Sequence, residues 1–131
     1  MENKNIKIGI IGFGSVGKQL YKTLLENDYD DTLIYIFADD IDLNEEKRKF
    51  KFQDFKKDTF KDIYFIPALG YLSKNLRLSI LHYLTENNYN IFSFIHPTAF
   101  VSKNAKIGKG VIIYPLCNIN QRVVINDCCI L

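Results

Sequence analysis

Aliphatic residues recur at every sixth position through the last third of this chain. The positions are Ile95, Val101, Ile107, Ile113, Ile119, Ile125 and Leu131. A small or short side chain follows four residues after each of the first six, at Ala99, Ala105, Val111, Cys117, Val123 and Cys129. A helix repeats near 3.6 residues and a strand near 2, so neither period explains the pattern. A six-residue period predicts a parallel β-helix in which each hexad forms one flat side of a coil.

The two recurring positions have different places in such a coil. The aliphatic side chain points into the narrow interior, and the small side chain fits the cramped position beside the corner. At about 18 residues per triangular coil, the six hexads of 95–131 make about two coils. Stacked repeats usually need three or more units and a polar cap, whereas this sequence closes on Cys128-Cys129-Ile130-Leu131. We therefore expect a fragment, or a truncated form, of a longer protein.

Composition argues against two classes of partner. The 131 residues carry a net charge of +2 with both signs scattered, so we expect no nucleic-acid surface. The longest apolar runs, such as 8–13 and 34–38, are far shorter than the roughly 20 residues of a membrane helix. Residues 1–5 lead directly into a strand-like segment and leave no room for a signal peptide. We expect a cytoplasmic protein without membrane contact.

The three cysteines fit the same compartment. Cys117, Cys128 and Cys129 lack the paired spacing of a zinc site, and adjacent cysteines rarely form a disulfide with each other. Cys117 and Cys129 also occupy the small position of the hexad. We expect buried, small hydrophobic side chains in a reducing environment, and no metal site.

A glycine-rich turn follows the first predicted strand, 6–11. The turn is Gly12-Phe13-Gly14-Ser15-Val16-Gly17, and a helix over 18–27 follows it, with an apolar face of Val16, Leu20, Leu24 and Leu25. In this context Gly12 allows the tight turn, Gly14 the approach of a phosphate, and Gly17 close packing of helix on strand. Free N–H groups and the positive helix end favour an anion. The candidate binding residues here are Gly12, Gly14, Ser15, Val16 and Gly17.

An acidic pair follows the second predicted strand, 33–37. Asp39 lies 22 residues after Gly17 (39 − 17), near the place where such folds bond a ribose hydroxyl. The alternative is that Asp39, Asp40 and Asp42 only solvate a turn. We take Asp39 and Asp40 as candidate ligand residues.

Two further strands complete a small parallel sheet. They span 63–67 and 89–95, and Ser73 caps the helix between them, whose inward face is Leu76, Ile80, Leu81 and Leu84. The order β-α-β, β-α-β predicts parallel strands with helices on both faces. Ligands of such sheets bind at the carboxyl ends of the strands. The turn Ala68-Leu69-Gly70 lies at that edge and is the third candidate binding segment.

Several polar residues receive structural roles. Lys47, Arg48, Lys49 and Lys51 could grip a phosphate, but a solvated connection over 42–62 fits their charged surroundings better. His82 has no acidic partner in view and is interpreted as a boundary residue of its helix. His96 lies where the sheet hands over to the hexads and is interpreted as a structural cap. We assign no catalytic residue.

A small glycine-turn α/β domain followed at once by hexads resembles the bacterial sugar O- and N-acyltransferases of the sialic acid O-acetyltransferase type. The resemblance covers nearly the whole chain. It is carried by the order and spacing of the glycine turn 12–17, Phe37-Ala38-Asp39-Asp40, Ala68-Leu69-Gly70, Phe94-Ile95-His96-Pro97-Thr98-Ala99 and the hexads.

This resemblance implies a Rossmann-like nucleotide-sugar-binding domain over 1–94 and the start of a left-handed parallel β-helix over 95–131. It implies a homotrimer, with acetyl-CoA between neighbouring coils and a nucleotide-sugar, a UDP-sugar by preference, on the first domain. The glycine turn would lie against the phosphates and the acidic pair near the nucleoside. A histidine of the coil would remove the proton of the sugar amine or hydroxyl.

The sequence departs from the family at this histidine. In the family it follows about one hexad beyond Ile125–Leu131, and neither His82 nor His96 matches it. The expected function is thus the nucleotide-sugar-binding portion of an acetyltransferase for surface glycans, inactive on its own. Two alternatives stay open: a nicotinamide-dependent oxidoreductase, because of the glycine turn and Asp39, and a non-catalytic hexad module.

Overall fold

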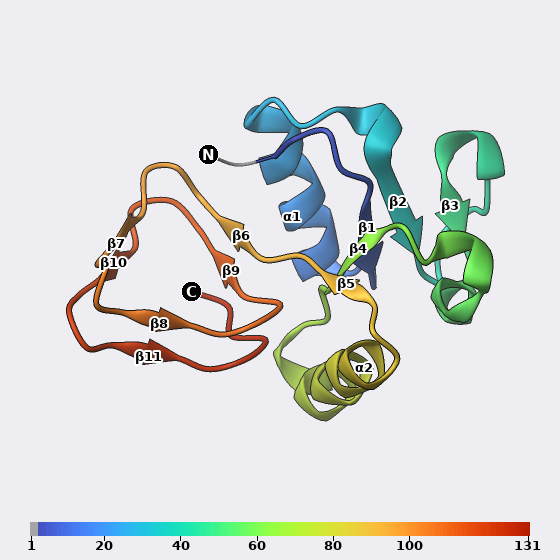
Figure 1. Ribbon diagram of the computed structural model, residues 1–131. Coiled ribbons are helices and arrows are strands. Elements are labelled where there is room, and N and C mark those ends of the chain that lie inside the picture. The colour runs from blue at the N-terminus through green and yellow to red at the C-terminus, as the bar shows by residue number, and fades with distance from the viewer. Residues whose placement is uncertain (1–2) are drawn as a thin grey trace.

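The structure is a computed structural model and describes residues 3–131. The first part contains β1 (Ile8–Ile11), α1 (Ser15–Glu26), β2 (Ile34–Phe37), β3 (Lys49–Phe50), β4 (Tyr64–Pro67), α2 (Lys74–Glu86) and β5 (Asn90–Ile91). The second contains β6 (Phe94–Ile95), β7 (Phe100–Val101), β8 (Lys106–Ile107), β9 (Ile112–Ile113), β10 (Asn118–Ile119) and β11 (Val124–Ile125). Short 3-10 turns connect several of them, and Figure 1 shows the two parts side by side. No helix within residues 3–131 is both long and apolar enough to cross a membrane.

The first five strands form one parallel sheet in the order β3-β2-β1-β4-β5. β1 lies at its centre, with Ile8 opposite Ile34 of β2 and opposite Tyr64 of β4. All four residues of β1 are buried, as a strand covered on both faces requires. The predicted parallel sheet is therefore confirmed. The predicted strand over 89–95 instead divides into β5 and β6, which belong to different sheets.

Two hydrophobic cores cover opposite faces of this sheet. One packs Leu20 and Leu24 of α1 against Ile8, Ile10 and other residues of the sheet. The other packs Ile80 and Leu84 of α2 with an aromatic group from the sheet and the segment that follows β3, namely Phe37, Phe55, Phe65 and Tyr89. Leu25 is exposed on α1, which corrects its predicted place on the apolar face. The helix also begins at Ser15, three residues earlier than predicted.

The segment 42–62 is more ordered than the predicted solvated connection. It contributes the edge strand β3, which pairs with β2, and the buried Phe55. Its aromatic side chains reach the sheet, with ring centroids of Phe37 and Phe50 5.4 Å apart and those of Phe37 and Phe60 5.2 Å apart. Aromatic rings at five-residue spacing, 50, 55 and 60, match neither period used for prediction because 3-10 turns separate them.

Two predictions about α2 are wrong. Leu76 is 47% exposed, while the neighbouring Arg77 is buried at 8%. Ser73 lies at the helix start but its side chain makes no capping hydrogen bond. Arg77 can be buried because Nη1 of its guanidinium donates a hydrogen bond to the carbonyl of Leu69 at 2.8 Å.

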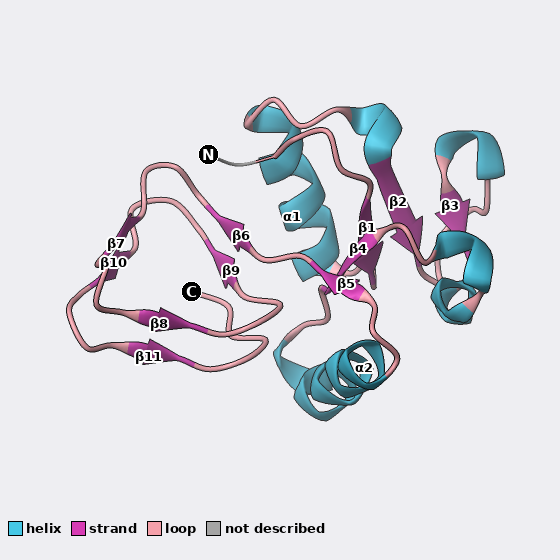
Figure 2. Ribbon diagram, in the orientation of Figure 1, coloured by secondary structure: helices cyan, strands magenta, loops and turns pink. Residues whose placement is uncertain are grey.

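The hexads form a triangular coil, as their period predicts. Each strand pairs with the strand 18 residues further on: Phe94 with Ile112, Phe100 with Asn118, and Lys106 with Val124. Figure 2 shows the short strands along the sides and loops at the corners. Inside, Val111, Ile113 and Ile119 form a core with the other predicted interior positions, except Cys129 and Leu131. A bridge from Ile112 to Ile130 begins the next layer.

The corners of the coil follow the same period. Gly110, Leu116, Arg122 and Cys128, six residues apart, have φ of 66°, 64°, 65° and 60°. Three of the four are not glycine, so the corners adopt this left-handed conformation without depending on glycine's freedom.

One side of the coil is built into the α/β part. Phe94 of β6 and Ile112 of β9 belong to the same core as Leu20 and Leu24 of α1, and Ile130 packs against it. At the neighbouring corner, a side chain at Gly110 would touch Leu81 of α2. The coil and the sheet therefore share one hydrophobic core.

Candidate functional site

The carboxyl ends of β1, β2 and β4 open into one cavity of about 320 Å³. Such a volume lies within the roughly 300–1,000 Å³ of small-molecule sites. Its lining is Gly12, Phe13, Gly14, Ala38, Asp39, Asp40, Phe52, Ala68, Leu69, Gly70 and Ser73. The three candidate segments of the sequence thus meet at the predicted edge of the sheet. Phe13, Ala38, Phe52 and Ser73 were not among the candidates.

The backbone requires glycine at two positions of the turn, at Gly12 because of its positive φ and at Gly17 because of close packing against the backbone. Gly12 has φ +98°, and its N–H donates to the carbonyl of Phe37 at 2.9 Å. A side chain on Gly12 would collide with Leu69, and one on Gly17 would collide with the carbonyl oxygen of Gly12. Gly17 therefore sits beneath the cavity rather than in its wall.

Gly14 has a different environment. It is exposed at the start of α1, with φ −77°, and no atom lies within 4 Å of the place where a side chain would begin. The fold itself places no demand for glycine here. The 12-residue helix has no side-chain cap and no acidic residue in its first turn, so its positive end faces the cavity uncompensated.

The next two candidates of the turn lie outside the lining. Ser15, the first residue of α1, is exposed. Val16 is half-buried and packs against the core beneath α1. Of the five glycine-turn candidates, Gly12 and Gly14 line the cavity.

The acidic pair lies on the second wall, and both side chains are exposed. Oδ1 of Asp39 accepts a hydrogen bond from the N–H of Phe52 at 3.0 Å. Asp39 thereby fixes the segment after β3 against the cavity and keeps its second carboxylate oxygen available. The sequence could not place Phe52 here because the bond spans 13 residues of irregular chain.

The turn after β4 makes the third wall. The N–H of Ala68 donates to the carbonyl of Ile11 at 2.8 Å, which carries the sheet ladder up to the cavity. The side chain of Leu69 leans over Gly12. Its carbonyl accepts from Nη1 of Arg77 on α2, so a buried cation holds this wall from behind.

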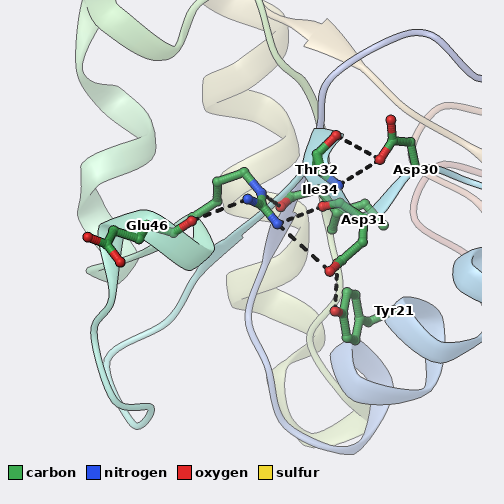
Figure 3. A network of polar contacts seen from close by, with 7 residues as sticks. Tyr21, Asp30, Asp31, Thr32, Ile34 and Glu46 are labelled. Carbon is green, nitrogen blue, oxygen red and sulfur yellow. Dashed lines mark hydrogen bonds and ion pairs between the residues drawn. The ribbon is translucent and has the colours of Figure 1, made fainter.

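A second hollow, of about 400 Å³, lies on the other side of Phe13. Arg48 is one of its lining residues, and Figure 3 shows the partners of its guanidinium. Nε donates to the carbonyl of Ile34 at 3.0 Å and Nη2 to that of Asp31 at 2.8 Å. The carboxylate of Asp31 also accepts from the hydroxyl of Tyr21 at 2.6 Å. Arg48 is thus engaged in closing the 3-10 segments onto β2.

Comparison with solved structures relates this fold to known proteins. The acetyltransferase domain of PglB from Neisseria gonorrhoeae FA1090 matches with a TM-score of 0.80 and 21% identity, over 96% of this chain and 62% of that one. A mutant of perosamine N-acetyltransferase from Caulobacter crescentus, in complex with CoA and GDP-perosamine, matches with a TM-score of 0.76 and 20% identity, over 94% and 58%. This chain shares its fold with these two sugar acetyltransferases.

A sequence match points the same way. Over 35 residues the chain is 51% identical to an acyl-[acyl-carrier-protein]–UDP-N-acetylglucosamine O-acyltransferase from Bartonella quintana. The matched stretch covers 27% of this chain and 13% of that protein. No protein-family model matches. The chain spans about three fifths of the length of the acetyltransferase structures that it resembles.

Neither histidine of this acetyltransferase fold lies in the cavity lining. His82 is exposed on α2 and lies 3.0 Å from Glu86, an acidic partner four residues on that the sequence interpretation overlooked. Nδ1 of His96 accepts from the N–H of Thr98 at 3.0 Å, which closes the turn into the coil and supports the predicted capping role. Within residues 3–131 no cluster of His, Cys, Asp and Glu could hold a metal ion.

Proposed function

We propose that the cavity binds a nucleotide-sugar and that the chain serves acetyl transfer from acetyl-CoA to an amino or hydroxyl group of that sugar. The observation that carries this proposal is the start of α1, which has no side-chain cap. Gly14, the N-cap residue, lines the cavity and has open space around it. A diphosphate fits this place because backbone N–H groups and the helix dipole both favour negative charge. The neighbouring fold whose structure contains CoA and GDP-perosamine supports the choice of ligand class.

In the proposed complex the glycine turn holds the phosphates and the acidic pair faces the nucleoside. The second oxygen of Asp39 is the acceptor for a ribose hydroxyl or a base N–H. The transfer forms a bond between the sugar nitrogen or oxygen and the acyl carbon and breaks the thioester C–S bond. The sugar proton goes to a base, and the released thiolate takes up a proton. We assign this base to neither His82 nor His96.

Acetyl-CoA is proposed to lie against the outer sides of a left-handed coil, between copies of a homotrimer. The sides β7/β10 and β8/β11 face away from the shared core. They carry exposed apolar residues, with Phe100 57% and Val124 59% exposed. Such surfaces suit a pantetheine arm and a neighbouring coil.

A ligand panel tests the proposal. UDP-, GDP-, CMP- and dTDP-sugars are added to the 131-residue chain beside NADH, and the melting temperature is followed. A nucleotide-sugar at a hundredfold excess over its Kd should stabilise the fold by about 2.7 kcal/mol. Among these ligands we favour the UDP-sugar. Saturable binding of NADH without binding of any nucleotide-sugar would support the oxidoreductase instead.

A second measurement addresses catalysis. Because no histidine lines the cavity, we expect this chain to release little or no CoA from acetyl-CoA in the presence of an amino-sugar nucleotide. Rapid CoA release would contradict that expectation. If the chain binds a nucleotide-sugar but no transfer occurs, even after the chain is extended by further hexads, a non-catalytic binding module would be favoured.

A further inference from the structure

Arg77 is a buried cation without an anionic partner. It is 8% exposed, and no carboxylate within residues 3–131 forms an ion pair with it. Nη1 donates to the carbonyl of Leu69 at 2.8 Å, whereas Nε is buried and has no hydrogen-bond partner in the described structure. Arginine stays charged in proteins. A buried, incompletely bonded guanidinium is costly, so a compensating interaction is expected.

The cavity beside it has the opposite imbalance. Its lining contains two carboxylates, Asp39 and Asp40, and no lysine, arginine or histidine. An anionic ligand in this cavity would meet repulsion from both carboxylates and attraction from the start of α1. Arg77 lies one hydrogen bond behind the third wall, where the low dielectric of the interior lengthens the reach of its charge.

We propose that Arg77 determines the affinity of the cavity for the phosphates of its ligand, by fixing the Ala68-Leu69-Gly70 wall and by supplying positive potential behind it. This rests on the proposed function only for the nature of the ligand. Arg77 is a positioning residue, since it acts through the carbonyl of Leu69.

The coil takes part in this arrangement. Sγ of Cys128, at the last corner of the second coil, lies 3.9 Å from the carbonyl oxygen of Arg77 and donates to it. Burial raises the pKa of this thiol to about 11, so the proton remains in place near neutral pH. The wall of the cavity is thereby linked through α2 to the coil, across 51 residues of sequence.

Three variants separate position from charge. Arg77→Met removes both the charge and the bond to Leu69, and Arg77→Lys keeps the charge but not the planar fork. Leu81→Ala, one turn further along α2 and equally buried, is the control for lost stability. All measurements are made well below the melting temperature of each variant.

The first readout requires no ligand. Amide hydrogen exchange of a peptide covering residues 68–74 should rise in Arg77→Met and stay at the wild-type level in Leu81→Ala. Equal exchange in wild type and Arg77→Met would overturn the role of Arg77 in fixing the wall.

The second readout uses UDP and GDP, with uridine and guanosine as uncharged counterparts. Arg77→Met should weaken binding of the preferred diphosphate about tenfold or more, and Arg77→Lys should weaken it less. In both variants the loss of affinity should be smaller for the nucleoside than for the diphosphate. An equal loss for nucleoside and diphosphate would overturn the electrostatic part. A wild type that binds neither diphosphate would overturn this electrostatic part. The nucleotide-sugar panel still decides the proposed function, and the exchange measurement still decides the wall.

Discussion

Oδ1 of Asp127 accepts a hydrogen bond at 2.8 Å from the backbone N–H of Lys109, which lies one full coil below it. The same spacing of 18 residues relates two other side-chain bonds, from the N–H of Leu116 to Oγ1 of Thr98 and from the N–H of Val111 to Oγ of Ser93. Each bond satisfies a corner N–H that the short strands leave unpaired. Polar side chains at the corners therefore fix the register of one coil on the next.

Asp127→Ala should destabilise the chain by about 0.5–1.5 kcal/mol, because the N–H of Lys109 loses its acceptor. Asp127→Asn keeps an acceptor oxygen and should recover most of the loss. Urea unfolding curves give both values. An Asn variant as unstable as the Ala variant would show that the carboxylate charge, rather than the bond, matters.

Gly14→Ala and Gly17→Ala should have different consequences. The first adds a methyl group in open space at the N-cap of α1, so it should cost only about 0.5–1 kcal/mol, because alanine is a poorer N-cap than glycine, while weakening binding of a nucleoside diphosphate. The second forces the methyl group against the carbonyl oxygen of Gly12 and should cost about 1–3 kcal/mol or more. Thermal denaturation and a binding titration of both variants provide the comparison. An unchanged affinity of Gly14→Ala for the diphosphate would contradict the proposal that the phosphates bind at this turn.

Tyr21→Phe should reveal a stabilising contribution that disappears in alkali. Burial, followed by the hydrogen bond to Asp31, raises the pKa of Tyr21 from 10 to about 12. A pKa that is higher in the folded chain gives stability that is complete below pH 10 and is lost as the pH rises through about 12. The difference in unfolding free energy between wild type and Tyr21→Phe should thus shrink from pH 9 to pH 11.5. A constant difference would contradict the raised pKa of Tyr21.

Cys128 should react last among the three cysteines with a thiol reagent at pH 8. It is buried, and its pKa of about 11 leaves little thiolate, whereas Cys117 and Cys129 are half-buried. Mass spectrometry after timed labelling identifies the modified residues. Labelling of Cys128 before Cys117 would show that the last corner of the coil opens readily.

The parts of the structure that follow one repeated rule could be predicted from the sequence. The hexads determine the coil because strands 18 residues apart pair with each other. Gly12 follows from the positive φ of the tight turn and Gly17 from close packing of the helix on the backbone. The inward turn of Arg77 could not be predicted because its acceptor is a carbonyl rather than a charged side chain. Phe52 and the edge strand β3 escaped prediction because 3-10 turns carry no hydrophobic period.

The cavity was predicted where parallel strands end, and its three walls lie there. The individual contributions were harder to foresee. Ser15 and Val16 belong to the same motif as Gly14, but the helix begins at Ser15 and neither residue is part of the cavity lining. The motif thus located the cavity to within a few residues, whereas the start of the helix decided which of its residues line that cavity.

Phe94 and Ile112 insert one side of the coil into the core beneath α1, so the two parts have no hinge between them. Heating should melt them in a single cooperative transition. A molecule that grips the two outward sides of the coil would, by the same rigidity, set the direction in which the cavity opens. The orientation of the coil therefore fixes the orientation of the cavity at the edge of the sheet.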